Sequence, residues 1–337
     1  MDRAAPNLEQ ALMRGHGLQV LAVILVVASA AGSLPLVTSS SFSDQTVNNG
    51  NLISAVPDWV APTVTPAAIA KTAGGSAGFL KASGTYYVYA SATDSGAPAS
   101  GIGSVTANVS TVTTGQTAVP LVAGSYSAGG VSYSYRSAQL TAKATLGAGP
   151  LAFSVTATDQ AANSATAAFS VTGDNTVPSA TDVQATNVAG GTVAMPELGD
   201  TLILTYSEVM DWTTILAGWT GATTNVQLKL VAPAGNTNDY IEVYSPSQVL
   251  LPLGTITLGS KDFAKNDVVF GATGTPTTMI ASGSALTFVL GTPSVGADTS
   301  KTASAMTWTP STTTTDRAGN ATSATPRTET GASDKDF

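Results

Sequence analysis

Short segments of alternating apolar and polar residues run through this chain from residue 59 onward, and turn-forming residues separate them at roughly ten-residue spacing. Examples are "GTYYVYASATD", "IGSVTANVST" and "GDTLILTYSEVMD". Charged residues make up only 10% of the chain, and the helix-favouring residues Leu, Glu, Lys and Arg are scarce beside Thr, Ser, Ala, Val and Gly. No segment sustains a long helical period. The pattern therefore predicts an all-β protein.

Strands that alternate in this way, separated by short turns, are typical of two antiparallel sheets packed face to face. We predict two tandem immunoglobulin-like β-sandwich domains, at residues 59–174 and 175–337, and a length of 337 residues suits two domains. The stretch "LAFSVTATDQAANSATAAFSVTGDN" predicts a hairpin whose turn covers residues 159–164. In the second domain, residues 211–221 predict a short helical turn.

The aromatic residues fall on both faces of the expected strands. "GVSYSYRS" places Val131, Tyr133 and Tyr135 together, and strand alternation requires about half of the tyrosines to point outward. Outward rings would offer stacking surfaces for glycans, whereas the tryptophans are expected in the core. The residues concerned are Tyr86, Tyr87, Tyr89, Tyr126, Tyr133, Tyr135, Trp212, Trp219 and Trp308.

The most apolar segment lies near the N-terminus. "LQVLAVILVVASAAG" covers residues 18–32, follows Arg3 and Arg14, and has the length of a signal-peptide apolar region. Small residues suited to cleavage follow at 28–30 and 39–41. We expect a signal peptide at residues 1–41 that forms a helix, followed by an extended linker at 42–58. The alternative is a retained membrane anchor, since about 20 residues could just span a bilayer.

The stretch after the apolar segment carries a family resemblance. "TSSSFSDQTVNNGNLISA" is similar to the processing region of proteins cleaved by the SipW-type signal peptidase, the camelysin and TasA group. Phe42-Ser43-Asp44 and Asn48-Asn49 match that region, whereas Ser40 stands where the group often has Ala. The resemblance implies export and a new N-terminus in the cleavage region. That region comprises Thr38, Ser39, Ser40, Ser41 and Phe42.

A second resemblance covers the predicted domains. "SGAPASGIGSVTANVS", "FSVTATDQAANSATAAFSV", "DNTVPS" and "TDRAGN" resemble repeats of bacterial immunoglobulin-like surface domains, in which a Thr-Asp-x-Ala-Gly-Asn turn ends a domain. "GDTLILTYSE" is similar to such domains in actinobacterial surface proteins. Ala162 stands where the first turn usually has Gly, while the second turn has Gly319. The resemblance implies a cell-surface protein.

Several chemistries are closed to the mature chain. It has no cysteine, and its only histidine, His16, lies in the leader. Removal of the leader therefore excludes Ser-His-Asp and Cys-His catalysis and ordinary zinc sites. A net charge of −8 with no cluster of Lys or Arg argues against nucleic-acid binding. We expect no enzyme; a hydrolase that uses paired carboxylates such as Glu208 and Asp211 is the third hypothesis.

Oxygen-bearing side chains gather around the domain junction and the predicted turns. Such groups are the ligands that calcium prefers, although Asp and Asn also cap turns with their own side chains. No DxDxDG loop is present. We therefore expect no cofactor, and calcium is the one candidate if a metal is bound. The candidate ligands are Asp58, Asp94, Asp159, Asn163, Asp174 and Asn175.

These observations predict an exported, non-catalytic structural or adhesive protein of the bacterial cell surface or extracellular matrix. The expected partners are other surface or matrix proteins, glycans, or further copies of the chain, with a membrane contacted only through the uncleaved leader. The alternative function is a secreted module that binds carbohydrate or protein through exposed aromatic residues. A fold of this kind does not choose between the two.

Overall fold

The computed structural model describes residues 58–331 and residue 337, and residues 56–337 form one compact unit. The expected signal helix, the linker up to residue 57 and the cleavage region lie outside the described residues. Within those residues the structure contains nineteen strands and one short 3₁₀ helix, so the all-β prediction is confirmed. No helix among them is long and apolar enough to cross a membrane.

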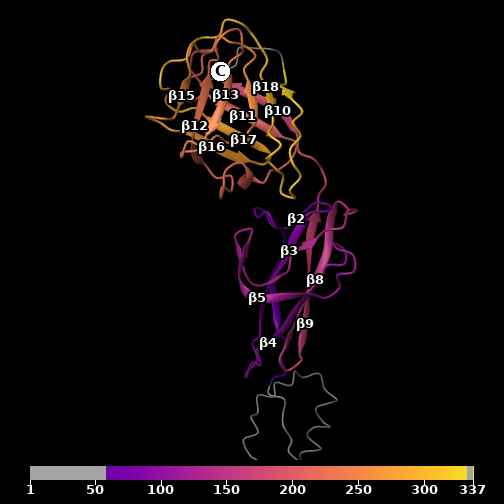
Figure 1. The fold of residues 1–337 in the computed structure, drawn as a ribbon. Coiled ribbons are helices and arrows are strands. Elements are labelled where there is room, and N and C mark those ends of the chain that lie inside the picture. The colour runs from indigo at the N-terminus through magenta and orange to yellow at the C-terminus, as the bar shows by residue number, and fades with distance from the viewer. Residues whose placement is uncertain (1–57, 332–336) are drawn as a thin grey trace, which may run out of the picture. The chain divides into compact units, whose positions relative to one another are not determined.

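Residues 58–173, here called the N-terminal β unit, form a nine-stranded sheet with the order β1-β3-β6-β5-β4-β8-β9-β2, and β7 pairs with β3 (Figure 1). The predicted hairpin is present, because β8 and β9 pair antiparallel along their whole length. The strands are β1 (Thr63–Lys71), β2 (Phe79–Leu80), β3 (Thr85–Thr93), β4 (Ile102–Asn108), β5 (Val119–Ala128), β6 (Val131–Ser137), β7 (Leu140–Thr141), β8 (Gly149–Asp159) and β9 (Ser164–Gly173).

The core of the N-terminal β unit lies between two layers, since β1 contacts β8 and β9, which are far from it along the sheet. Alternate residues of β3 face this core, with Tyr86, Val88 and Ala90 fully buried. Val105 and Ala107 of β4 are buried from the other layer, as their alternation predicts. The two-residue period of the sequence thus places the apolar side chains of each strand into one shared interior.

Four other tyrosines of this unit form a separate cluster, here called the tyrosine patch: Tyr87, Tyr89, Tyr126 and Tyr133. The guanidinium carbon of Arg136 lies 4.4 Å from the ring centre of Tyr87 and 4.5 Å from that of Tyr126. The prediction that Val131, Tyr133 and Tyr135 lie together is wrong. Val131 is exposed, Tyr133 belongs to the patch, and Tyr135 packs against the main core.

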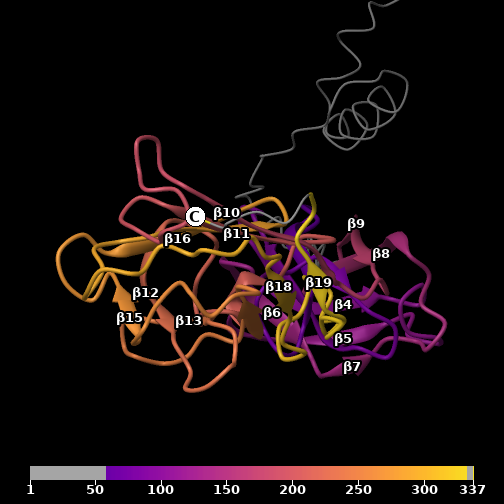
Figure 2. The same cartoon turned by 90° about the horizontal axis from the view of Figure 1, so that it is seen from above.

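Residues 174–337, here called the C-terminal β unit, form a ten-stranded sheet with the order β10-β11-β17-β16-β12-β13-β14-β18-β19, and β15 pairs with β12 (Figure 2). The strands are β10 (Ala180–Thr186), β11 (Thr201–Tyr206), β12 (Thr224–Val231), β13 (Tyr240–Tyr244), β14 (Thr255–Thr257), β15 (Val268–Phe270), β16 (Thr277–Ser282), β17 (Ala285–Val289), β18 (Thr307–Thr309) and β19 (Arg327–Thr328).

Large aromatic side chains fill the core of the C-terminal β unit. Trp308 is fully buried, donates its indole N–H to the Leu253 carbonyl at 2.8 Å, and meets the ring of Tyr206 edge-on at 4.8 Å. Trp219 is 8% exposed and Trp212 is partly buried against the same core. These three tryptophans are therefore core residues, as predicted, because each indole finds a packed site and two of them donate to carbonyls.

The predicted helical turn is the 3₁₀ helix η1 (Trp212–Thr214). The side chain of Asp211 caps it by accepting a hydrogen bond from the Thr213 backbone N–H. Ile215, directly after the turn, is buried in the core. The core residues of the two β units form separate clusters, one drawn from residues 64–171 and one from residues 183–337.

The two Asp-x-x-x-Asn turns allow a direct test of backbone strain. Ala162 adopts φ 69° and Gly319, at the matching position, adopts φ 94°. A side chain in this region costs about 1 kcal/mol. We expect Ala162→Gly to raise the free energy of unfolding by about 0.5–1 kcal/mol and Gly319→Ala to lower it by about 1 kcal/mol. Urea denaturation measures the free energy of unfolding of both variants. A destabilised Ala162→Gly variant would contradict the backbone strain inferred at Ala162.

Candidate metal centres

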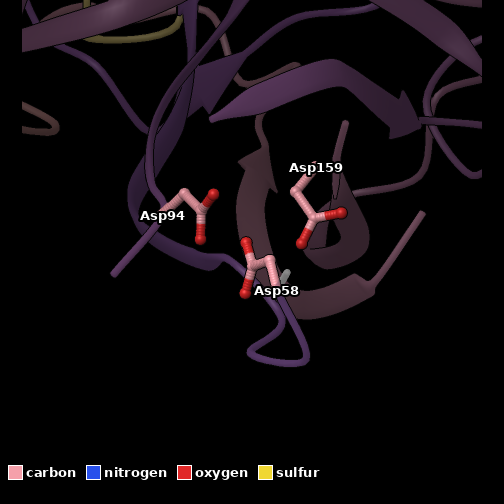
Figure 3. A group of neighbouring side chains, drawn as sticks. All are labelled: Asp58, Asp94 and Asp159. Carbon is pink, nitrogen blue, oxygen red and sulfur yellow. The ribbon is translucent and has the colours of Figure 1, made fainter. Parts of the chain in front are cut away.

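Three carboxylates meet at one end of the N-terminal β unit. Asp58 precedes β1, Asp94 follows β3 and Asp159 ends β8, and one oxygen of each lies within 4.8 Å of the others (Figure 3). We call this group the first triad. β1 and β3 are antiparallel neighbours, so the start of one strand and the end of the other fall at the same edge. Sheet topology therefore gathers residues that are distant in the sequence.

The turn after β8 explains the position of Asp159. Its Oδ1 accepts the backbone N–H of Asn163 at 2.8 Å, and its Oδ2 accepts the Asn163 side-chain amide at 2.8 Å. The same amide also donates to the Asp58 carbonyl at 3.2 Å. One asparagine thus closes the turn and joins it to the segment before β1.

Asp58 and Asp94 are held by backbone donors. Asp58 is 2% exposed and accepts the N–H groups of Val60 at 2.9 Å and Ser100 at 2.8 Å. These bonds hold the pKa of Asp58 below its usual value. Oδ2 of Asp94 accepts the Gly101 N–H at 2.7 Å. A Cβ at Gly96 would lie 2.4 Å from Oδ1 of Asp58, so this loop approaches the triad closely only because residue 96 is glycine.

The C-terminal β unit has a second triad in the corresponding place. Asp174 precedes β10, Glu208 follows β11 and Asp316 opens the second Asp-x-x-x-Asn turn, again with one oxygen of each within 4.8 Å of the others. Oδ2 of Asp316 accepts the Asn320 side-chain amide at 2.7 Å, and that amide donates to the Asp174 carbonyl at 3.0 Å. Strand β10 pairs antiparallel with β11, as β1 does with β3.

The two triads are therefore equivalent, residue by residue. Asp58 corresponds to Asp174, Asp94 to Glu208, and Asp159 to Asp316, with the same asparagine contacts in both. The equivalence extends to the backbone, since the N–H of the first turn residue donates to the carbonyl four residues later in both turns, at 3.0 and 3.1 Å. Two sites built alike in one chain indicate a common requirement rather than two unrelated turns.

Ordinary turn chemistry accounts for most of these oxygens but leaves one in each triad. Oδ1 of Asp94 and Oε1 of Glu208 are buried and have no hydrogen-bond partner within the described residues. An unpaired buried carboxylate oxygen beside two other carboxylates is costly, because burial and like-charge repulsion act together. A divalent cation would supply the missing partner, and an all-oxygen donor set fits calcium.

Electrostatic repulsion is most visible at Glu208. Burial raises the pKa of Glu208 to about 7, and the neighbouring carboxylates of Asp174 and Asp316 push it in the same direction. Without a cation Glu208 thus takes up its proton at a higher pH than an ordinary glutamate does. A bound cation reverses this preference, since its charge favours the ionised carboxylates.

The second triad also lies beside the contact between the two β units. Lys71, at the end of β1, is 2.5 Å from the carboxylate of Asp211 and donates to the Arg317 carbonyl at 2.7 Å. Lys81 donates to the Gly319 carbonyl at 2.5 Å. The turn that supplies Asp316 is therefore also the surface on which the N-terminal β unit rests.

The structure brings five of the six candidate ligands to the two triads. Asp58, Asp94, Asp159 and Asn163 meet at the first triad, and Asp174 belongs to the second. Asn175 joins neither: its side chain accepts the Ala82 N–H and donates to the Leu146 carbonyl.

Sequence reasoning missed two ligands of the second triad. Asp316 could have been found, because "TDRAGN" repeats "TDQAAN". The second residue of each motif is the aspartate that begins an Asp-x-x-x-Asn turn. Glu208 follows β11 as Asp94 follows β3, but the two sequences around them are unlike. The carboxylates of Glu208 and Asp211, the pair suggested for hydrolysis, have different partners. Glu208 belongs to the second triad, whereas Asp211 pairs with Lys71.

No protein-family model matches the chain, and no curated protein was found that resembles it.

The raised pKa of Glu208 predicts a pH dependence in the presence of chelator. Between pH 4.5 and about 7 the folded state retains a proton that the unfolded state has lost, so Glu208 makes stability fall as pH rises across this window. Urea denaturation at several pH values measures the slope. Glu208→Gln should remove this component, and identical slopes for the two proteins would contradict it.

Proposed function

We propose that this protein is an exported, non-catalytic structural or adhesive component of the bacterial cell surface or extracellular matrix. It consists of two tandem immunoglobulin-like β-sandwiches, each carrying a calcium site at the end where its first strand begins. Its role is mechanical, since burial between layers makes each sandwich stiff and the cations fix the loops that join them.

The repetition of the triad is the observation that carries this proposal. A lone acidic cluster is common on protein surfaces, but here the same three positions recur with the same asparagine contacts and one orphaned oxygen each. Two equivalent sites in successive units suit a protein whose units must be held in a fixed relation. A catalytic chain would need only one such site.

The second triad has a direct mechanical consequence. Asp174 lies in the connection between the two units, and Asp316 begins the turn whose carbonyls accept Lys71 and Lys81. A cation held by both residues ties the connection to that turn. Calcium would therefore stiffen the joint as well as the C-terminal β unit, and extracellular calcium is abundant enough to fill weak sites.

The test is calcium-dependent thermal unfolding. We expect the melting temperature to rise on adding calcium and to fall with chelator, because a ligand that binds only the folded state stabilises it in proportion to the logarithm of its concentration. Asp94→Asn and Glu208→Gln should each lose part of this rise, and the double variant nearly all of it.

Asp182→Asn is the matched control, since Asp182 is a carboxylate that accepts hydrogen bonds from Thr330 outside both triads. It should keep the full calcium response. Equal melting temperatures of the unaltered chain in calcium and in chelator would refute the calcium sites, while magnesium at the same concentration tests selectivity.

The tyrosine patch favours a second function, that of a glycan-binding module. The Arg136 guanidinium lies over the rings of Tyr87 and Tyr126. Aromatic faces beside a guanidinium suit the apolar faces and hydroxyls of sugars. The patch is only partly exposed, with Tyr89 and Tyr133 at 7% and 6%. With so little exposed ring surface, we propose glycan binding only in addition to the structural role, not in its place.

A glycan array tests this second function. Saturable binding that Tyr126→Ala or Arg136→Ala weakens by about tenfold would support it, since losing one good aromatic or charge-assisted contact is worth about 1.4 kcal/mol. Tyr240→Ala, a tyrosine of the other β unit, is the control. Absence of any glycan signal, or equal losses in the control, would count against it.

A further inference from the structure

The contact between the two β units provides a template for docking. Two features of the C-terminal β unit meet the N-terminal β unit there: the Asp316–Asn320 turn, with two of its carbonyls and the Arg317 side chain, and Asp211. Lys71 and Lys81 donate to the carbonyls of Arg317 and Gly319, and the Arg317 guanidinium lies 3.9 Å from the ring centre of Phe79. We call this arrangement the docked turn.

The N-terminal β unit has the same turn, which we call the uncovered turn because its residues 160 and 162 are exposed among the described residues. Gln160 and Ala162 are exposed, whereas their equivalents Arg317 and Gly319 are half-buried. Ala161 is half-buried, whereas its equivalent is 2% exposed. The backbone hydrogen bonds of the two turns agree, so docking accounts for the difference in burial.

An apolar pair is exposed beside this uncovered turn, whereas Asp58 and Asp159 of the first triad are buried. Trp59 is 74% exposed and Val60 is 47% exposed, directly after Asp58 of the first triad. Within the described residues, the carbonyls of Gln160 and Ala162 accept no hydrogen bond of the kind that the lysines make at the docked turn. An exposed tryptophan near carbonyls that accept no such bond is suited to a partner that brings an apolar contact and lysines.

The opposite end of the C-terminal β unit carries exposed lysines. The loop between β10 and β11 lies at that end, away from Asp174 and Glu208, and it is joined to the 300 region by the hydrogen bond from Ser300 N–H to the Ala194 carbonyl. Exposed Lys261, Lys265 and Lys301 line a hollow of about 400 Å³ there. Two aspartates share the hollow, and one of them, Asp298, lies 3.4 Å from Lys265.

We propose that the uncovered turn of the N-terminal β unit is a docking surface for a second copy of this chain, which presents the lysine end of its C-terminal β unit. Lysines of that copy donate to the carbonyls of Gln160 and Ala162, as Lys71 and Lys81 do at the docked turn, and Trp59 packs beside them. The contact joins two different surfaces, so it is heterologous and continues into an open chain or closes into a ring. The proposal deepens the structural role proposed above and rests on it.

Sedimentation velocity in calcium tests this docking directly. We expect mass to grow with concentration beyond a dimer, because each copy keeps one free surface of each kind. Trp59→Ala, Lys261→Glu and Lys301→Glu should each weaken association by about tenfold or more. Arg327→Glu makes the same charge change at an exposed residue of β19 and should leave association unchanged.

Disulfide trapping gives a second measurement, which is clean because the chain has no cysteine of its own. The double variant Ala162→Cys with Lys301→Cys should form a ladder of covalent oligomers on mild oxidation. Ala162→Cys paired with Arg327→Cys should give no ladder above the level expected from random collision.

Three outcomes overturn the docking: a chain that stays monomeric at all concentrations, association unaffected by the Trp59 and lysine variants, or equal trapping in both cysteine pairs. Calcium-dependent melting of the same samples separates the two proposals. A monomer that calcium stabilises would refute the docking and leave the calcium sites intact. A calcium-insensitive chain that still forms ladders would do the reverse.

Discussion

In both β units, one aspartate accepts two hydrogen bonds from the asparagine four residues later. The end of each unit depends on this interaction. Asp159 and Asp316 each accept the backbone N–H and the side-chain amide of that asparagine, and the amide reaches on to the carbonyl before the first strand. The turn, the incoming chain and the end of the hairpin are thereby fixed together. Without this closure the third carboxylate, from Asp94 or Glu208, would have no group to approach.

Closure creates a problem that the side chains alone do not solve. Orienting the aspartates to hold the asparagine brings three carboxylates within 4.8 Å, and one oxygen in each set remains unpaired. The second set responds by raising the pKa of Glu208 to about 7, while in the first set the backbone N–H groups on Asp58 keep that residue's pKa low. A bound cation would neutralise the repulsion in both sets, which is why the duplicated arrangement carries more weight than either set alone.

Much of the fold was predictable from the sequence, because the two-residue period is a local property. Leu202, Leu204 and Tyr206 alternate with half-buried neighbours as the pattern predicts, and the β8–β9 hairpin follows from two strands around one turn. Tyr133 and Tyr135 show the limit. They share a period of two, yet a register irregularity in the neighbouring strand β5 accompanies their separation between the patch and the core.

The candidate sites depend on which strand ends meet, and local sequence does not specify that. Asp58, Asp94 and Asp159 are spread over about a hundred residues, and only antiparallel pairing of β1 with β3 brings the first two to one edge. Glu208 was missed for the same reason, since its only relation to Asp94 is its place after the equivalent strand. Asn175 shows the reverse error: adjacency to Asp174 suggested a ligand, whereas its amide fastens the connection to Ala82 and Leu146.

The joint shows how one turn can serve two purposes without conflict. The side chain of Asp316 points to the triad and to Asn320, while the carbonyls of Arg317 and Gly319 are left for Lys71 and Lys81. Side chain and backbone therefore act on different partners, and holding one orders the other. Because a backbone carbonyl is present whatever the residue, Gln160 and Ala162 can offer the same acceptors as Arg317 and Gly319 although their side chains differ. The same backbone geometry, fixed by one aspartate and one asparagine, thus presents the same two carbonyl acceptors in both turns.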